Sequence, residues 1–312
     1  VTGPGASAYL DRVFCSRLPE VGRVRLSYML TPKGRIWSEA TIARLDSDRF
    51  LLCGPTLADL RDYDWLHDQL PDNESVQLTH GNRYDAALLL MGPKSRELLS
   101  RLTDVDLSAQ AMPWMSVSEI VVAGESCIAM RVSYVGELGW ELHLESASLS
   151  QVYAEICRVG DAYGLADFGS WSLNAMRIEK AYHGWGADFG TEYTMYDAGL
   201  EKFIDFTKSD FVGRDAVLQQ RADPADWEFV RLMIDIDDAE PLPGDPIMSE
   251  RECVGYITSA SGGYRLNQCV ALGYMKAGRH LSNLEVEILG QPRPALQCET
   301  AFYDPESRLC RG

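Results

Sequence analysis

The chain has 312 residues, of which 46% are hydrophobic and 24% are charged, and its formal net charge is −17 at pH 7. This composition is typical of a globular protein and excludes a disordered chain, and the length is enough for two or three lobes with their own cores. The acidic excess, with no basic run to offset it, repels phosphate backbones and anionic lipid. We therefore expect neither nucleic acid nor membrane as a partner.

Targeting, cysteine and metal signals are weak. No stretch approaches the roughly 18 apolar residues of a membrane span, and no signal pattern opens the chain, so we expect a cytoplasmic protein, or a matrix protein in mitochondria if the source is eukaryotic. The eight cysteines form no CxxC pair and the histidines form no HExxH, which favours reduced thiols and no metal site. Because the chain opens on Val1 as though inside a strand, we interpret it as a fragment whose N-terminal part is missing.

Turn signals and hydrophobic periodicity predict two helix-and-strand regions in the first part of the chain. The expected helices cover 6–13, 57–70, 94–102, 149–163 and 172–181, and the expected strands cover 23–28, 36–45, 50–53, 86–91, 119–122 and 126–132. The stretches TGPGASAYLDRV and MGPKSRELLSRL share a Gly-Pro turn followed by an amphipathic helix. This weak internal repeat predicts two related α+β lobes.

The pattern changes after about residue 228. Short β-like runs punctuated by Pro and Gly predict strands over 230–236, 254–257, 270–274 and 284–289. Such runs at short spacing are typical of a small sheet or barrel. A boundary near 222–227 follows, with one domain over 1–225 and a second over 226–312.

The sequence contains no GxGxxG, GxxxxGK[ST] or GxSxG motif, which argues against a dinucleotide site, a P-loop and a nucleophile elbow within it. The segment 132–144, VSYVGELGWELHL, reads instead as a strand, a turn and a second strand. On an alternating strand, Trp140 and Leu142 share one face and Glu141 takes the other. A carboxylate there can accept the two parallel N–H bonds of a pterin edge, although a hairpin with solvated glutamates gives the same pattern.

The segment 132–144 resembles the Y-[TV]-G-E-x-G-[WF]-E signature of the glycine cleavage aminomethyltransferase (T-protein) family. Three more stretches fit that family in order: MLTPKGRIWSEATIARL (29–45), RIEKAYHGWGADFGTEYTMYDAGL (177–200) and DFVGRDAVL (210–218). The resemblance runs to the C-terminal YDPESRL and most resembles the folate-binding half of dimethylglycine and sarcosine dehydrogenases. It implies an α+β fold in which two ferredoxin-like lobes form a folate site, followed by a C-terminal β-barrel.

The same resemblance implies site residues. Glu39 stands where the family has an Asp close to the folate nitrogens, so we expect it to be catalytic, with one extra methylene moving the carboxylate by about 1 Å. Tyr134, Glu141 and Tyr182 match positions that contact the pterin. Explanations that involve no ligand are a solvated carboxylate for Glu39, a surface strand for Glu141 and core packing for the tyrosines.

Two further residues and one departure complete the predicted site. Glu192 lies in an aromatic, Gly-punctuated loop that we place at the folate mouth. Folate is anionic, and Arg265 is our candidate to meet its carboxylates, although a lone turn arginine can also simply be solvated. Leu173 and Asn174 replace an Arg-Asp pair of the family, which puts dependence on a lipoyl carrier in doubt, and Arg177 with Glu179 is expected to form a structural pair.

Three functions remain open. The first is capture by tetrahydrofolate of the methylene group released from an N-methylglycine, with FAD held only in a flavin oxidase domain or subunit outside this sequence. The second is a folate-dependent demethylase acting on an O- or S-methyl donor. The third is a non-catalytic folate-binding or interaction module, whose relatives carry a Cys that the Lys180-Ala181-Tyr182 stretch lacks.

Overall fold

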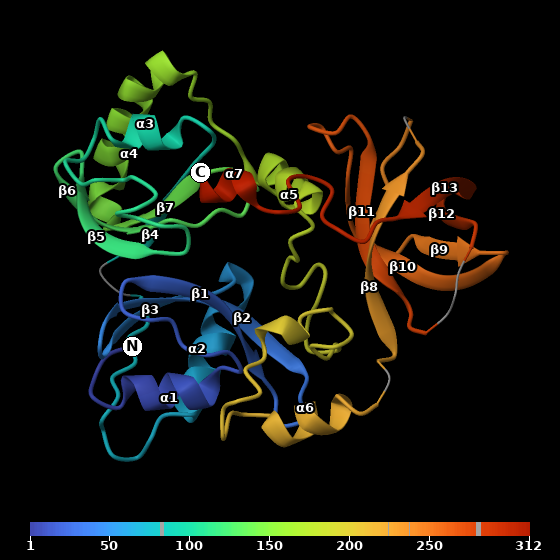
Figure 1. The fold of residues 1–312 in the computed structure, drawn as a ribbon, viewed down its shortest axis with the longest axis horizontal. Coiled ribbons are helices and arrows are strands. Elements are labelled where there is room, and N and C mark those ends of the chain that lie inside the picture. Colours follow the sequence, from blue (N-terminus) through green and yellow to red (C-terminus); the bar gives the residue numbers. More distant parts are fainter. Residues whose placement is uncertain (82–83, 224, 237, 279–281) are drawn as a thin grey trace. The chain divides into compact units, whose positions relative to one another are not determined.

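The computed structural model describes residues 1–81, 84–223, 225–236, 238–278 and 282–312 (Figure 1). Contacts divide the chain into two compact units. The first comprises Val1–Ser27, Ala40–Phe168 and Ser307–Gly312, and the second comprises Tyr28–Glu39 and Gly169–Glu306. Every helix in the described ranges is too short or too polar to cross a lipid bilayer.

The first unit contains two antiparallel sheets, and the strands β1 and β2 continue from it into the second unit. Its elements are α1 (Ala6–Val13), β1 (Arg23–Leu30), β2 (Ile36–Asp46), β3 (Arg49–Cys53), η1 (Thr56–Ala58), α2 (Asp59–Asp68), β4 (Ala86–Met91), α3 (Ser95–Leu99), β5 (Val117–Val122), β6 (Glu125–Met130), β7 (Gly139–Leu144), α4 (Ser146–Gly160), η2 (Asp161–Tyr163) and α7 (Arg308–Arg311). The strand orders are β1-β2-β3 and β4-β7-β6-β5. Both sheets belong to one compact unit together with the helices between their strands.

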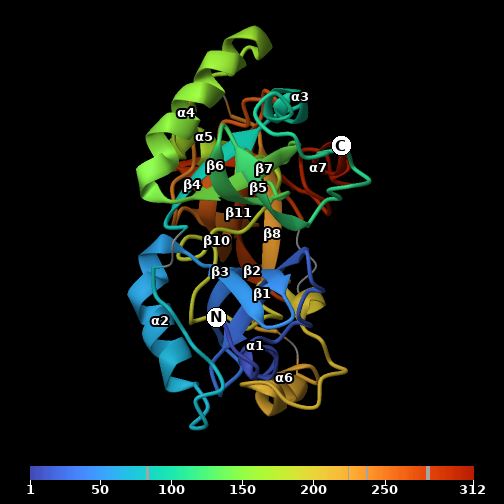
Figure 2. The same ribbon diagram turned by 90° about the vertical axis from the view of Figure 1, so that its left-hand side faces the viewer.

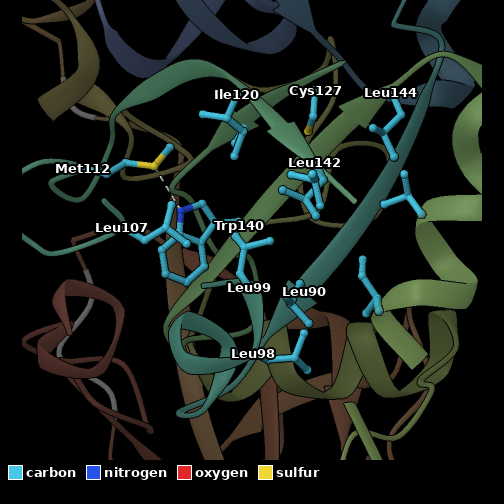
Figure 3. Close-up of a cluster of buried hydrophobic side chains, with 14 of the residues drawn as sticks. Leu90, Leu98, Leu99, Leu107, Met112, Ile120, Cys127, Trp140, Leu142 and Leu144 are labelled. Carbon is cyan, nitrogen blue, oxygen red and sulfur yellow. Dashed lines mark hydrogen bonds between the residues drawn. The ribbon is translucent and has the colours of Figure 1, made fainter. Parts of the chain in front are cut away.

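Trp140 lies at the centre of the four-stranded sheet's core and is fully buried. Alternation along β7 turns Trp140, Leu142 and Leu144 toward α3 and α4, so both helices cover one face of this sheet (Figures 1, 2 and 3). The indole Nε1 donates to the sulfur of Met112 at 3.3 Å (Figure 3). The opposite face packs against the three-stranded sheet through a smaller cluster of Val24, Ala43, Leu51, Val117, Ile128 and Met130.

The second unit is built around a closed six-stranded barrel (Figure 1). Its elements are α5 (Ser170–Glu179), η3 (Glu201–Phe203), α6 (Arg214–Gln220), β8 (Trp227–Ile234), β9 (Pro246–Ser249), β10 (Glu252–Ser261), β11 (Cys269–Lys276), β12 (Leu284–Ile288) and β13 (Gln291–Gln297). The barrel order is β10-β11-β8-β13-β12-β9. The predicted mixed α and β chain ending in a β-barrel is confirmed.

Two barrel strands, β9 and β13, were not expected from the sequence. Pro246 opens β9, and β13 contains Pro292 and Pro294. Proline lacks the N–H that a strand donates, so its presence argues against a strand wherever only local pattern is read. Closure of the barrel pairs these segments with β12 and β8 nevertheless.

Candidate functional site

Glu39 lies on the half-buried face of β2, between the buried residues Ser38 and Ala40. Burial raises the pKa of its carboxyl to about 7; a hydrogen bond from Tyr28 on β1 opposes this rise, and the charge of Asp188 adds to it. A carboxyl with such a pKa exchanges a proton near neutral pH. It can therefore act as an acid, a base or a negative charge toward a cationic group.

Tyr28 is held tightly. Only 1% of its surface is exposed, and its ring meets Phe189 edge-on at 5.9 Å and Phe203 at 5.2 Å between ring centroids. Such edge contacts fix the orientation of the ring. The hydroxyl that reaches Glu39 consequently has little freedom.

Asp188 is fully buried and receives three hydrogen bonds. The backbone N–H of Gly184 donates at 2.8 Å, the hydroxyl of Thr258 donates at 2.5 Å, and Arg177 forms an ion pair with it. Arg177 also donates to the hydroxyl of Ser259 at 2.7 Å. The negative charge of this paired and hydrogen-bonded carboxylate contributes to the raised pKa of Glu39.

A β-bulge in β10 explains how two adjacent residues serve this pair. The pairing of β10 with β11 shifts between Ile257 and Ser259, which leaves Thr258 as the extra residue. Neighbouring side chains of a regular strand point to opposite faces, whereas a bulge can turn both toward one side. Thr258 thereby reaches Asp188 while Ser259 reaches Arg177.

The aromatic loop between α5 and η3 packs mainly against the barrel. Tyr193 is 6% exposed, stacks on Tyr274 at 4.2 Å between centroids and shares a hydroxyl contact with Tyr256. Tyr182 is partly buried. The side chain of Glu192 is exposed, and the backbone carbonyl of Glu192 accepts a hydrogen bond from the guanidinium of Arg35. Tyr193 is therefore a core residue of the second unit, although the sequence pattern placed this loop at the folate mouth.

The predicted strand–turn–strand over 132–144 is wrong in its first half. The strand β6 ends at Met130, the residues 132–138 form an irregular loop with Gly136 at φ 79°, and β7 begins only at Gly139. Tyr134 lies in this loop and is partly buried. Glycine permits the left-handed backbone conformation that the loop adopts at residue 136.

Glu141 occupies the face of β7 opposite Trp140, as the alternation predicts. The carboxylate of Glu141 lies 3.3 Å from Nε2 of His143, and 24% of the Glu141 side chain is exposed. Burial raises the pKa of Cys53 on β3 to about 12, and the charge of Glu141 contributes to the rise. Glu141 thus lies near β3, on the side of its sheet that faces the three-stranded sheet.

Arg265 is engaged by a carboxylate of this chain. Its guanidinium pairs with Glu179 on α5, donates to the carbonyl of Met176 at 3.1 Å, and covers the ring of Tyr303 at 3.8 Å. The expected pair of Arg177 with Glu179 is therefore wrong, because Arg177 pairs with Asp188 and Glu179 with Arg265. Both partners come from segments remote in sequence, which local spacing could not reveal.

The six predicted site residues divide between the units. Tyr134 and Glu141 belong to the first unit, and the second contains Glu39, Tyr182, Glu192 and Arg265. Sequence reasoning missed Tyr28 and Asp188 near Glu39, and His143 beside Glu141. Of these, His143 carried a signal, since it lies two residues from Glu141 and therefore on the same strand face.

Two other features lie apart from these residues. A depression of about 1200 Å³ on the first unit, lined mainly by the segment after α3 and by residues of β5, β6 and α4, includes none of the six. Within the described ranges, no group of three or more His, Cys, Asp or Glu is arranged to hold a metal ion. All eight cysteines are free thiols, and four of them are buried.

The chain matches two sequence models of one family: residues 1–208 match the GCVT N-terminal domain, and residues 228–304 match the glycine cleavage T-protein C-terminal barrel domain. It is 31% identical over 299 residues to the mitochondrial dimethylglycine dehydrogenase of Mus musculus, covering 95% of this chain and 34% of that protein. It is also 31% identical over 281 residues to the mitochondrial pyruvate dehydrogenase phosphatase regulatory subunit of Mus musculus, covering 88% of this chain and 32% of that protein.

In three dimensions, the chain resembles the glycine cleavage system aminomethyltransferase T from Bartonella henselae, with a TM-score of 0.85 and 21% sequence identity. The match covers 97% of this chain and 83% of that one. The fold is therefore shared over almost the whole chain. By contrast, the chain spans only about a third of the length of the two mouse proteins.

Proposed function

Since this chain belongs to the glycine cleavage T-protein (aminomethyltransferase) family, a family that binds tetrahydrofolate, we propose that it transfers a one-carbon unit to that acceptor. The unit is the methylene group released when an N-methylglycine of the dimethylglycine or sarcosine type is oxidised, and the product is 5,10-methylenetetrahydrofolate. The observation that carries the proposal is Glu39, a carboxyl held by Tyr28 whose pKa is raised to about 7.

The chemistry requires a group of this kind. Oxidation of the N-methyl group leaves a cationic iminium carbon, and tetrahydrofolate supplies two N–H nitrogens that become bonded to that carbon in turn. The bond from the carbon to the original amine breaks with its electron pair remaining on the amine. Of the two N–H protons released, one goes to the departing amine and the other leaves the site. Glu39 as a carboxylate would stabilise the cation, and with a pKa of about 7 it can then accept and release that proton.

Glu141 and Tyr134 are proposed to bind the pterin. The side chain of Glu141 is 24% exposed, so we propose that its carboxylate accepts two parallel N–H bonds, with His143 at 3.3 Å helping to fix its orientation. Tyr182 and Glu192 are proposed to line the mouth of the site. Arg265 would meet the folate carboxylates only while sharing its guanidinium with Glu179, so we expect its contribution to be small.

A flavin partner is part of the proposal. Oxidation of an N-methyl group needs an electron acceptor, and the sequence contains no dinucleotide fingerprint. The dimethylglycine dehydrogenase that the chain resembles is about three times as long as the matched region. We propose that FAD is held by a further domain or by a separate subunit. The proposed location is the cytoplasm, or the mitochondrial matrix if the source is eukaryotic.

Calorimetric titration with 5-formyltetrahydrofolate tests the site. We expect micromolar binding by the wild-type chain, a loss of at least tenfold in Glu141→Ala, and little change in Glu39→Gln. Single-turnover assays with an iminium donor should show a slower one-carbon transfer in Glu39→Gln than in the wild type, even at saturating folate. Absence of binding by the wild-type chain would contradict the proposal.

A second candidate function is a binding module that does not catalyse. It is favoured by the 31% identity to a protein named as a regulatory subunit and by the replacement of the family Asp with Glu39. The single-turnover assay separates the two, because a binding module would take up folate in the titration but transfer no one-carbon unit, so that the wild type and Glu39→Gln would be equally inactive.

A further inference from the structure

The C-terminal segment 307–312 returns to the first unit, although the residues immediately before it belong to the second. In Figures 1 and 2, α7 lies beside the four-stranded sheet. Cys310 is only 2% exposed, and the guanidinium of Arg311 lies 5.3 Å from the centre of the Trp114 ring. The segment is therefore docked through a buried side chain as well as through surface contacts.

The docking involves a buried arginine at the start of the loop 132–138. Arg131 is 1% exposed and directly precedes this loop. Its guanidinium donates to the carbonyl of Met112 at 2.6 Å and to the carbonyl of Arg311. Burial lowers its pKa and the charge of Arg96 adds to that effect, while no carboxylate within the described ranges forms an ion pair with it.

The guanidinium of Arg131 depends on both of its carbonyl acceptors. Its Nε already lacks a partner among the described residues, so two backbone carbonyls satisfy a fully buried positive charge. A buried charge that loses a hydrogen bond is strongly disfavoured. Undocking of Arg311 would therefore drive Arg131 to move, and the loop that begins at the next residue would move with it.

The segment also touches the end of the same loop. A methyl group added to Gly312 would lie 2.9 Å from Cδ1 of Leu138 and 2.9 Å from a guanidinium nitrogen of Arg96. The carbonyl of Leu138 in turn accepts from the backbone of Gly92 at 2.7 Å. The guanidinium groups of Arg96 and Arg131 lie 5.9 and 6.0 Å from the centre of the Trp140 ring, which belongs to the buried core of this sheet.

We propose that the segment 307–312 is a strap that holds the loop 132–138 at both ends and thereby positions Tyr134 for folate. This inference rests on the proposed function, because Tyr134 is assigned to the pterin there. Arg131 is the positioning residue in this scheme, and Cys310 marks the buried position through which the segment docks. Arg131 acts on the ligand through the loop, and not by touching it.

Hydrogen exchange of the ligand-free chain, read by mass spectrometry, is the first test. Cys310→Asp places a charge in the buried position and should raise exchange in peptides covering 132–138 by about tenfold. Cys310→Ala preserves docking and should leave exchange unchanged. Leu309→Ala is the matched control, because Leu309 is 41% exposed on the same turn. Unchanged exchange in Cys310→Asp would overturn the strap.

Titration with 5-formyltetrahydrofolate is the second test. Affinity should fall about tenfold in Cys310→Asp and remain at the wild-type value in Cys310→Ala and Leu309→Ala. Arg131→Lys, which retains the charge but can hold only one of the two carbonyls well, should reproduce both effects if Cys310→Asp fails to fold. Raised exchange with unchanged folate affinity would overturn the positioning role.

The exchange result does not depend on folate. If the wild-type chain bound no folate, the proposed function would fail together with the ligand part of this inference, whereas the exchange pattern would still decide whether the segment restrains the loop.

Discussion

Glu39 links stability to pH. Its pKa is about 7 in the folded chain and 4.5 in an ordinary carboxyl. Between these values the folded state holds a proton that the unfolded state releases, so stability is greatest below about pH 4.5 and falls as pH rises through 7. The full loss is about 3 kcal/mol. The same burial that suits Glu39 to proton exchange therefore makes its ionised form costly at neutral pH.

Glu39→Gln should remove this dependence. Gln resembles the protonated carboxyl, so we expect the unfolding free energy of the variant to exceed that of the wild type by less than about 1 kcal/mol at pH 5 and by about 3 kcal/mol at pH 8. Urea unfolding at pH 5, 6.5 and 8 measures the difference. Glu192→Gln, whose side chain is exposed, serves as the control and should follow the wild type. If the unfolding free energies of Glu39→Gln and the wild type changed equally with pH, Glu39 would not be buried in the folded chain.

At the scale of elements, the β-bulge in β10 holds the ion pair of Arg177 with Asp188, whose charge acts on Glu39. Thr258→Val keeps the shape of the side chain and removes the donor at 2.5 Å from Asp188. Because Asp188 stays buried, we expect a loss of about 1–3 kcal/mol in unfolding free energy, measured by urea titration. Thr258→Ser retains the hydroxyl and should lose less. A Thr258→Val variant as stable as the wild type would mean that Asp188 finds another donor.

Local pattern predicted the elements whose chemistry agrees with their surroundings. The alternation over 36–45 predicted the strand β2 that carries Glu39, and the alternation along β7 predicted the opposite faces of Trp140 and Glu141. The prolines of β13 hid that strand, because its formation depends on barrel closure. The loop 132–138 was misread because its course depends on buried contacts rather than on alternation.

The site residues show the same division. Glu39, Tyr134 and Glu141 were proposed through motif resemblance, and His143 could have been added to them from its spacing to Glu141. Tyr28 and Asp188 could not be identified, since their relation to Glu39 depends on strand pairing and on a loop about 150 residues away in sequence. Charge partners chosen by proximity in sequence failed for Arg177 for this reason.

At the scale of the whole molecule, the charge of −17 is a source of self-repulsion. Ion pairs between buried side chains, such as Arg177 with Asp188 and Arg265 with Glu179, are screened only weakly by dissolved salt. The remaining acidic residues lie mostly at the surface, where they repel one another over distances near the Debye length. Added salt should weaken the repulsion far more than it weakens these buried pairs.

We therefore expect the chain to melt at higher temperature in salt. Raising NaCl from about 0.02 to 0.3 M shortens the Debye length from about 20 Å to under 10 Å, and the melting temperature should rise by a few degrees. Scanning calorimetry at fixed pH measures the change. KCl should act like NaCl because the effect is screening, and sulfate is avoided because its exclusion from protein surfaces stabilises by another route. A melting temperature that fell with NaCl would mean that exposed ion pairs, such as Arg49 with Glu119, outweigh the net repulsion.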